Sequence, residues 1–146
     1  SSPTTIMSTT TRRLSLTMAL LLAACGGGPG PGDPGYPYNL VGVYTGRLTV
    51  EGEAFDAELD LSTSRGGRVR GTFRVRQPLE IDGRAEGTVI DDLLRLTVTY
   101  RSDGRADCDG RVEGILTVET GGGVIEGPVT IADCDDALSG RMSFRR

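Results

Sequence analysis

Two cysteines, each between aspartates, are the residues of this sequence whose types and spacing could do chemistry. Cys108 lies in the stretch Ala-Asp-Cys-Asp-Gly, and Cys134 lies in the nearly identical stretch Ala-Asp-Cys-Asp-Asp. Such a pair could bind a metal ion, act as a redox centre or form a structural disulfide. The choice depends on the other residue types in the chain and on the compartment in which it resides.

Most familiar catalytic groups are absent from the sequence. The chain has 146 residues and no histidine, and all 16 of its basic residues are arginine. Without histidine or lysine there is no conventional base to activate a serine or cysteine nucleophile, and two thiols would lack further soft ligands for a metal. The acids alternate outward along predicted strands, whereas glycosidase carboxylates converge in a cleft. We therefore predict no catalytic residues and no enzyme.

The aspartates beside the cysteines are candidate ligands for a hard cation. Carboxylates two residues apart followed by glycine occur in calcium-binding loops, and the candidate ligands here are Asp107, Asp109, Asp133 and Asp135. The full twelve-residue EF-hand pattern is absent, and arginines are interspersed among these acids. We expect a solvated charged rim without a cofactor, with a bound calcium ion as the alternative.

The first 24 residues have the layout of a secretory signal peptide. Arg12 and Arg13 precede an apolar run over residues 14–24, which is shorter than the roughly 20 residues that span a membrane. The Leu-Ala-Ala-Cys sequence that ends at Cys25 resembles the lipobox of bacterial lipoproteins. This resemblance implies that Cys25 becomes the mature N-terminus and carries covalently attached lipid, including a palmitate chain.

The lipobox resemblance also implies a location and a partner. Under the sorting rule for such lipoproteins, Gly26 after the cysteine implies the outer membrane, with the body on the periplasmic or cell-surface face. In a single-membrane bacterium the anchor would hold the protein on the outer face of the cytoplasmic membrane. Removal of residues 1–24 leaves 14 arginines against 20 acids, and an acidic body is not expected to bind nucleic acid.

Lipidation of Cys25 would leave Cys108 and Cys134 as the only thiols in an oxidising compartment, which favours a disulfide between them. The bridge would close a loop of about 26 residues and contribute roughly 3 kcal/mol. The inward positions are even-numbered before the turn at residues 120–123 and odd-numbered after it. A regular ladder would therefore place the two cysteines on opposite faces, so we expect irregular backbone near one of them.

Residues 25–38 are dominated by glycine and proline, in the sequence Cys-Gly-Gly-Gly-Pro-Gly-Pro-Gly-Asp-Pro-Gly-Tyr-Pro-Tyr. This composition favours neither a helix nor an interior strand. We predict a flexible tether over residues 25–38 and a single folded domain over residues 39–146.

Alternating apolar and polar residues dominate the predicted domain, with no convincing helical period. Phe55, Ala57 and Leu59 share one face of a predicted strand whose other face is acidic, and the next segment repeats the pattern with arginines. In a hairpin, the acidic row would therefore face the arginine row. We predict eight strands, at residues 40–51, 53–62, 67–76, 79–90, 93–101, 108–120, 123–132 and 137–145.

Eight short-connected antiparallel strands, each with one apolar face, favour an all-β, up-and-down β-barrel, with a two-sheet β-sandwich as the alternative. Glycines recur on the predicted inward face. They fit the strong curvature of a small barrel, although they could instead leave a cavity.

The predicted interior is almost wholly apolar and contains two tyrosines as polar groups. A cavity there would hold an apolar or amphipathic ligand. The candidate ligand-binding residues are Tyr44, Phe55, Phe73, Tyr100, Met142 and Phe144.

The barrel pattern and the Gly42-Val43-Tyr44 sequence resemble the start of calycins, the lipocalin and avidin group, in which a glycine and a tryptophan flank one residue of the first strand. Here tyrosine replaces the tryptophan. Since the chain has no tryptophan, the resemblance does not imply biotin binding. We expect a non-catalytic binding module, with a small hydrophobic ligand as its partner. The alternative is a structural protein that docks another envelope component through its charged outer surface.

Overall fold

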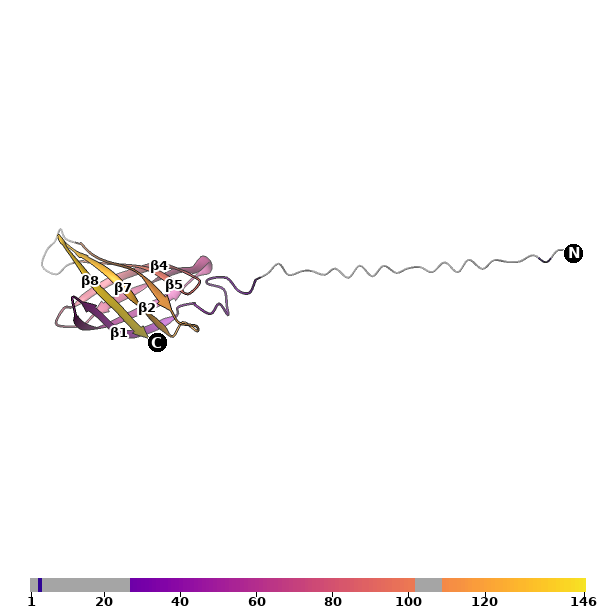
Figure 1. Cartoon of the computed structure of the whole chain (residues 1–146), viewed down its shortest axis with the longest axis horizontal. Coiled ribbons are helices and arrows are strands. Elements are labelled where there is room, and N and C mark those ends of the chain that lie inside the picture. The colour runs from indigo at the N-terminus through magenta and orange to yellow at the C-terminus, as the bar shows by residue number, and fades with distance from the viewer. Residues whose placement is uncertain (1–2, 4–26, 102–108) are drawn as a thin grey trace.

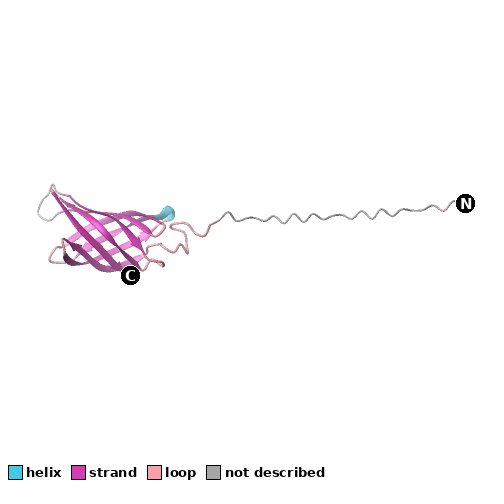
Figure 2. Cartoon of the chain, viewed as in Figure 1, coloured by secondary structure: helices cyan, strands magenta, loops and turns pink. Residues whose placement is uncertain are grey.

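The structure of the chain is a computed structural model that describes residue 3, residues 27–101 and residues 109–146. Its described part is one closed antiparallel sheet in which each strand pairs with the next and β1 pairs with β8 (Figures 1 and 2). The strands are β1 (Gly42–Val50), β2 (Glu53–Thr63), β3 (Arg68–Val75), β4 (Ile81–Ile90), β5 (Leu93–Arg101), β6 (Asp109–Val118), β7 (Val124–Asp133) and β8 (Asp136–Arg145).

This architecture confirms the predicted up-and-down barrel and excludes the sandwich. The strand boundaries agree with the predicted ones to within two residues. One 3₁₀ turn, η1 (Arg65–Gly67), precedes β3. Within residues 27–101 and 109–146, no helix is long and apolar enough to cross a membrane.

Alternation along each strand builds the core. On β2, Ala57, Leu59 and Leu61 are buried, while Asp56 and Asp60 are exposed. The other strands repeat this pattern, and in the described part of the chain the buried side chains are apolar except for the hydroxyl groups of Tyr44 and Tyr100. The interior is therefore stabilised by apolar burial, and charge is confined to the outer wall and the two ends of the barrel.

The outer wall has the predicted charge rows. Arg74 on β3 lies opposite Glu58 on β2 and opposite Asp82 on β4. The Arg74 Nε to Asp82 Oδ1 distance is 2.9 Å, but both side chains are more than half exposed. Such pairs contribute at most about 1 kcal/mol each, so they help to select the strand register more than they stabilise the fold.

Glycines on the inward face allow neighbouring strands to approach closely. A Cβ atom at Gly71 would collide with the carbonyl oxygen of Asp60, and one at Gly46 would collide with that of Ser143. The space that a side chain would fill at these positions is therefore occupied by backbone. This supports curvature, and not a cavity, as the role of these glycines.

The structure differs from the expected flexible tether over residues 30–38, because this segment lies against one end of the barrel. The backbone N–H of Gly66 donates to the Pro31 carbonyl (3.1 Å), and that of Gly121 donates to the Pro37 carbonyl (2.7 Å). The amide of Asn39 organises the segment internally by accepting from the Gly32 N–H and donating to the Asp33 carbonyl. We call this the capped end of the barrel.

Leu40 seals the capped end. It is fully buried, and both its N–H and its carbonyl are hydrogen-bonded to the hydroxyl of Thr63 at the end of β2. Arg146 closes the other side by donating to the carbonyls of Val41 and Gly121. These contacts and the whole core lie between residues 30 and 146, so residues 27–146 contain a self-contained folding unit.

Candidate functional site

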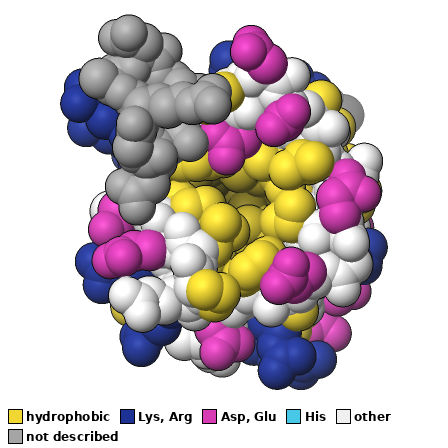
Figure 3. Space-filling view, turned by 90° about the vertical axis from the view of Figure 1, so that its left-hand side faces the viewer, with side chains coloured by type: hydrophobic (Ala, Val, Ile, Leu, Met, Phe, Trp, Pro, Cys, Tyr) yellow, Lys and Arg dark blue, Asp and Glu magenta, His cyan; other side chains and the backbone are white. Residues whose placement is uncertain are grey.

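No segment that the structure describes crosses the opposite end of the barrel, which we call the open end. It is formed by the loops 51–52, 76–80 and 134–135, together with the ends of β5 and β6. Figure 3 looks onto this open end and shows an apolar hollow surrounded by acidic side chains. The hollow is the candidate site, because concave apolar surfaces with a few polar groups are the usual form of small-molecule sites.

Partly buried apolar side chains line the hollow. Val50, Phe55 and Leu138 pack against the core without being enclosed by it. They come from the open-end parts of β1, β2 and β8, where Leu138 lies opposite Ile131 of β7. Gly140 lies opposite Val50, and a Cβ atom there would collide with the Thr49 carbonyl oxygen, so this glycine marks a close approach of the two strands. Apolar surface of these three side chains thus remains partly accessible at this end.

Tyr100 supplies the polar group of the hollow. It is only 6% exposed, and its ring lies over the backbone of Gly110, its partner on β6. Its hydroxyl makes no hydrogen bond to any residue that the structure describes. Burial, together with the negative charge of Asp133, raises the pKa of Tyr100 to about 12. The hydroxyl therefore stays protonated at neutral pH and can both donate and accept a hydrogen bond.

The rim around the hollow is strongly acidic. We define the rim as the open-end loops with the strand residues that adjoin them, namely residues 50–53, 75–81, 101, 109 and 133–136. It holds two arginines, Arg76 and Arg101, against seven acids: Glu51, Glu53, Glu80, Asp109, Asp133, Asp135 and Asp136. The rest of the described chain holds eleven acids and eleven arginines. The excess negative charge of the described residues is therefore concentrated at the mouth.

The structure divides the six predicted ligand-binding residues into two groups. Tyr44, Phe73, Met142 and Phe144 are at most 1% exposed and belong to the packed core. Phe73 and Phe144 make an edge-to-face contact with ring centroids 6.4 Å apart, and the Tyr44 hydroxyl donates to the Gly122 carbonyl at the capped end. Only Phe55 and Tyr100 lie at the mouth.

Tyr44 illustrates why the capped half is not a site. Its ring lies 5.7 Å from the guanidinium carbon of Arg146, and burial raises its pKa while the charge of Arg146 partly opposes this effect. Its one polar group already has a protein partner. Among the described residues, no buried side-chain oxygen or nitrogen lacks a hydrogen bond, so the core presents no unsatisfied group to a ligand.

The cysteine pair lies at the open end. Cys108 is outside the described residues, as is Cys25. Cys134 opens the two-residue loop between β7 and β8 with a φ of 56°, which is the left-handed conformation. The β6–β7 ladder is regular up to the pair Gly110 and Asp133. Cys134 directly follows the last pair of this ladder, and its left-handed backbone is irregular as expected near one cysteine. The pairing of Cys134 with Cys108 remains a prediction.

The predicted calcium ligands also surround the mouth, except that Asp107 is outside the described residues. Asp109 ends β6, Asp133 ends β7, and Asp135 lies in the adjoining loop. Within the described ranges, no three acids or cysteines are grouped closely enough to hold a metal ion. The calcium alternative therefore remains a prediction that depends on Asp107.

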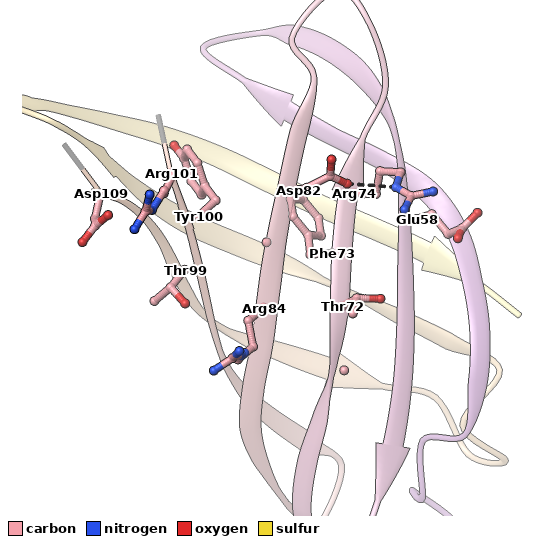
Figure 4. Close-up of a pocket in the computed structure, with 12 residues that line it drawn as sticks. Glu58, Thr72, Phe73, Arg74, Asp82, Arg84, Thr99, Tyr100, Arg101 and Asp109 are labelled. Carbon is pink, nitrogen blue, oxygen red and sulfur yellow. Dashed lines mark hydrogen bonds and ion pairs between the residues drawn. The ribbon is translucent and has the colours of Figure 1, made fainter. Parts of the chain in front are cut away.

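A second concave surface lies on the outer wall, across β3, β4 and β5 (Figure 4). It is an open groove of about 810 Å³. Its lining includes the outward residues Thr72, Arg84 and Thr99, and also Phe73, Tyr100 and Asp109. Arg74 and Asp82 form their ion pair along it. The groove mixes both signs of charge and is wide open to solvent, so it lacks the enclosure that small-ligand sites provide.

Comparison of the chain with protein-family models, with curated proteins and with solved structures found no match. The closed eight-stranded antiparallel barrel is nevertheless consistent with the calycin-like body that the sequence pattern resembles.

Sequence reasoning missed two features of the site. The contact of the Tyr100 ring with Gly110 depends on the β5–β6 register, which no single strand pattern reveals. The sequence predicts a charged rim from the aspartates beside the cysteines, but only the closed barrel shows that Glu51, Glu53 and Glu80 join it from other segments of the chain.

Proposed function

We propose that this protein is a lipid-anchored cell-envelope lipoprotein whose barrel binds a small hydrophobic ligand at its open end. The observation that carries the binding proposal is the apolar hollow at the mouth (Figure 3). Val50, Phe55 and Leu138 lie near the open-end termini of their strands and are only partly buried. A protein without a ligand or partner at this end would gain stability by filling it, as Leu40 fills the capped end.

The anchoring proposal rests on the Leu-Ala-Ala-Cys sequence and on the path of the chain. Residues 27–40 reach the barrel at its capped end (Figure 1). A lipid on Cys25 would therefore tether the capped end to the membrane, either the outer membrane or the outer face of a single cytoplasmic membrane. The open end would then face the aqueous compartment, where ligands are exchanged.

Native mass spectrometry under non-reducing conditions tests ligand binding. The protein is recovered from the envelope of its host, and residues 27–146 are released by proteolysis in the preceding segment. We expect a stoichiometric small-molecule adduct that is lost on gentle activation. A chain that consistently carries no adduct, even after incubation with envelope lipids, would contradict the binding proposal.

Lipidation is tested separately by growing cells with labelled palmitate. We expect label in the wild-type chain and none in Cys25→Ala, with Cys134→Ala as the control that keeps it. Label in the Cys25→Ala variant, or none in the wild type, would contradict the anchor.

The groove on the outer wall favours a second candidate function, the docking of another envelope component. Arg84 lines it without an ion pair among the described residues. The test compares two variants, one with cysteine at position 84 in the groove and one with cysteine at position 119 outside it. If docking occurs in the groove, cross-linking in envelope preparations should give one specific product, and only from the variant at position 84.

A further inference from the structure

The two ends of the barrel carry different charge. At the capped end, the loops and strand ends hold four acids and four arginines, namely Asp33, Asp91, Asp92 and Glu119 with Arg65, Arg68, Arg145 and Arg146. The rim at the open end holds seven acids and two arginines. An amphiphile that approaches the hollow therefore enters a field that attracts cations and repels carboxylates.

The rim acids are largely available to such a ligand. Glu53, Glu80 and Asp135 are exposed, and none of them forms an ion pair within the described residues. Carboxylates without ion-pair partners around the same mouth repel one another. A bound cation would relieve that repulsion.

A polar group without a protein partner among the described residues also lies at the open end. The Tyr100 side chain is more than nine-tenths buried, yet its hydroxyl has no hydrogen-bond partner among the described residues. The ring is held over Gly110, and the hydroxyl is near enough to Asp133 to be affected by its negative charge. Figure 4 shows Tyr100 next to Arg101 at the end of β5. Since no buried side-chain oxygen of the described residues lacks a hydrogen bond, the unbonded Tyr100 hydroxyl must reach solvent, where it can accept a hydrogen bond from a ligand group.

We propose that the ligand of the open end is a cationic amphiphile, in which an apolar body fills the hollow and an ammonium group lies between Tyr100 and the rim carboxylates. This inference rests on the proposed ligand-binding function and specifies its substrate class. The apolar body contacts Val50, Phe55 and Leu138. The ammonium N–H groups donate to the Tyr100 oxygen and to the carboxylates.

Three eight-carbon probes that differ only in the headgroup test this proposal: octylammonium, octanoate and octanol. Each is titrated into residues 27–146 by calorimetry at pH 7 and low salt, below the concentration at which it forms micelles. We expect one octylammonium ion per chain, bound about tenfold more tightly than octanol, with octanoate weaker than both. The preference should shrink to about threefold or less in 0.5 M salt, because ions screen the rim.

Matched variants locate the effect. The rim variant combines Glu53→Gln, Glu80→Gln, Asp109→Asn and Asp135→Asn, and we expect it to bind octylammonium and octanol alike. The control variant removes the same charge from the balanced remainder of the chain through Asp91→Asn, Asp92→Asn, Glu119→Gln and Glu126→Gln, all exposed residues. It should keep the wild-type preference.

Tyr100→Phe tests the hydroxyl. It should weaken octylammonium binding about threefold to tenfold and leave octanoate binding unchanged.

The outcomes separate the two proposals. Binding of octanol with no preference for octylammonium, or tighter binding of octanoate, would overturn the cationic class while leaving hydrophobic ligand binding intact. Binding of none of the three probes would overturn both. An equal loss of octylammonium preference in the rim and control variants would show that net charge, and not the mouth, selects the ligand, which also overturns the proposal.

Discussion

The capped and open ends of this barrel are built from the same strands but finished in different ways. At the capped end, Leu40 and Tyr44 fill the interior, and residues 30–39 add hydrogen bonds to the loops after β2 and β6. At the open end, three apolar side chains stay partly accessible and the Tyr100 hydroxyl lacks a protein partner among the described residues. The difference indicates that the capped end serves stability, and it supports our proposal that the open end binds a ligand.

The largest expected effect comes from removing the same side chain at the two ends. Leu40→Ala should lower the free energy of unfolding by about 2–5 kcal/mol, because it opens a cavity under the cap. Leu138→Ala at the mouth should cost less than about 1.5 kcal/mol, because solvent or a ligand already reaches that side chain. Urea unfolding of both variants measures the contrast. Equal losses would contradict the distinction between the two ends.

The cysteines sharpen the comparison, because the proposed disulfide would fix the open end. Reduction of the wild type should lower the free energy of unfolding by roughly 3 kcal/mol. The Cys108→Ser, Cys134→Ser double variant should be insensitive to reductant. The mass of the intact, non-reduced protein before and after alkylation tests whether the disulfide exists. Alkylation of both Cys108 and Cys134 would contradict it.

Gly110→Ala tests the position of Tyr100. An added methyl group would collide with the Tyr100 ring, which can swing toward the mouth at modest cost. Because the ring would then be better solvated, its pKa should fall from about 12 toward the ordinary value of 10.0. The ionisation of Tyr100 is followed by ultraviolet absorbance as the pH is raised, and it is identified as the transition that Tyr100→Phe lacks. Gly123→Ala, where the added atom meets open space, is the matched control. An unchanged titration in Gly110→Ala would show that Tyr100 does not lie over Gly110.

A smaller effect is expected at alkaline pH, where ionisation of Tyr100 should lower the free energy of unfolding. The folded-state pKa of Tyr100 is raised, so its contribution is complete below pH 10 and is lost as the pH rises toward about 12, because only the unfolded state releases the proton. The loss of unfolding free energy over this interval should be smaller in Tyr100→Phe than in the wild type. Denaturant titrations at pH 9 and at pH 11.5 test this. A larger loss in the variant would reverse the sign.

The smallest expected effect concerns the outer wall. Arg74→Ala removes an exposed ion pair with Asp82 and should change the free energy of unfolding by less than about 1 kcal/mol. Octylammonium affinity should not change. A loss of octylammonium binding in this variant, measured by the same calorimetry, would indicate that the ligand binds in the groove and not at the mouth.

The sequence predicted the strands well, because the alternation of apolar and polar residues has the two-residue period of a pleated strand. The acidic and arginine rows on the outward faces also favour pairing between neighbouring strands of opposite charge. It failed for residues 30–38, because glycine and proline specify only irregular backbone. The hydrogen bonds of Pro31 and Pro37 depend on loops that are distant in sequence.

The candidate site was predicted in part. Phe55 and Tyr100 lie at the mouth, but the other four predicted residues are core, because alternation assigns a residue to the inner face without showing its height along the barrel axis. Height follows from the register and the strand tilt, which require the closed sheet. The residues Val50 and Leu138 were missed for the same reason.

The most direct test of the central claim is a nuclear magnetic resonance titration of residues 27–146 with octylammonium, followed through the backbone amides. The account predicts that shifts concentrate at the open end, at residues such as Gly52, Glu80, Gly110 and Asp135, while Gly32, Gly66 and Gly122 at the capped end stay in place. Shifts centred on the capped end, or along the groove at Thr72 and Thr99, would contradict the assignment of the mouth as the binding site.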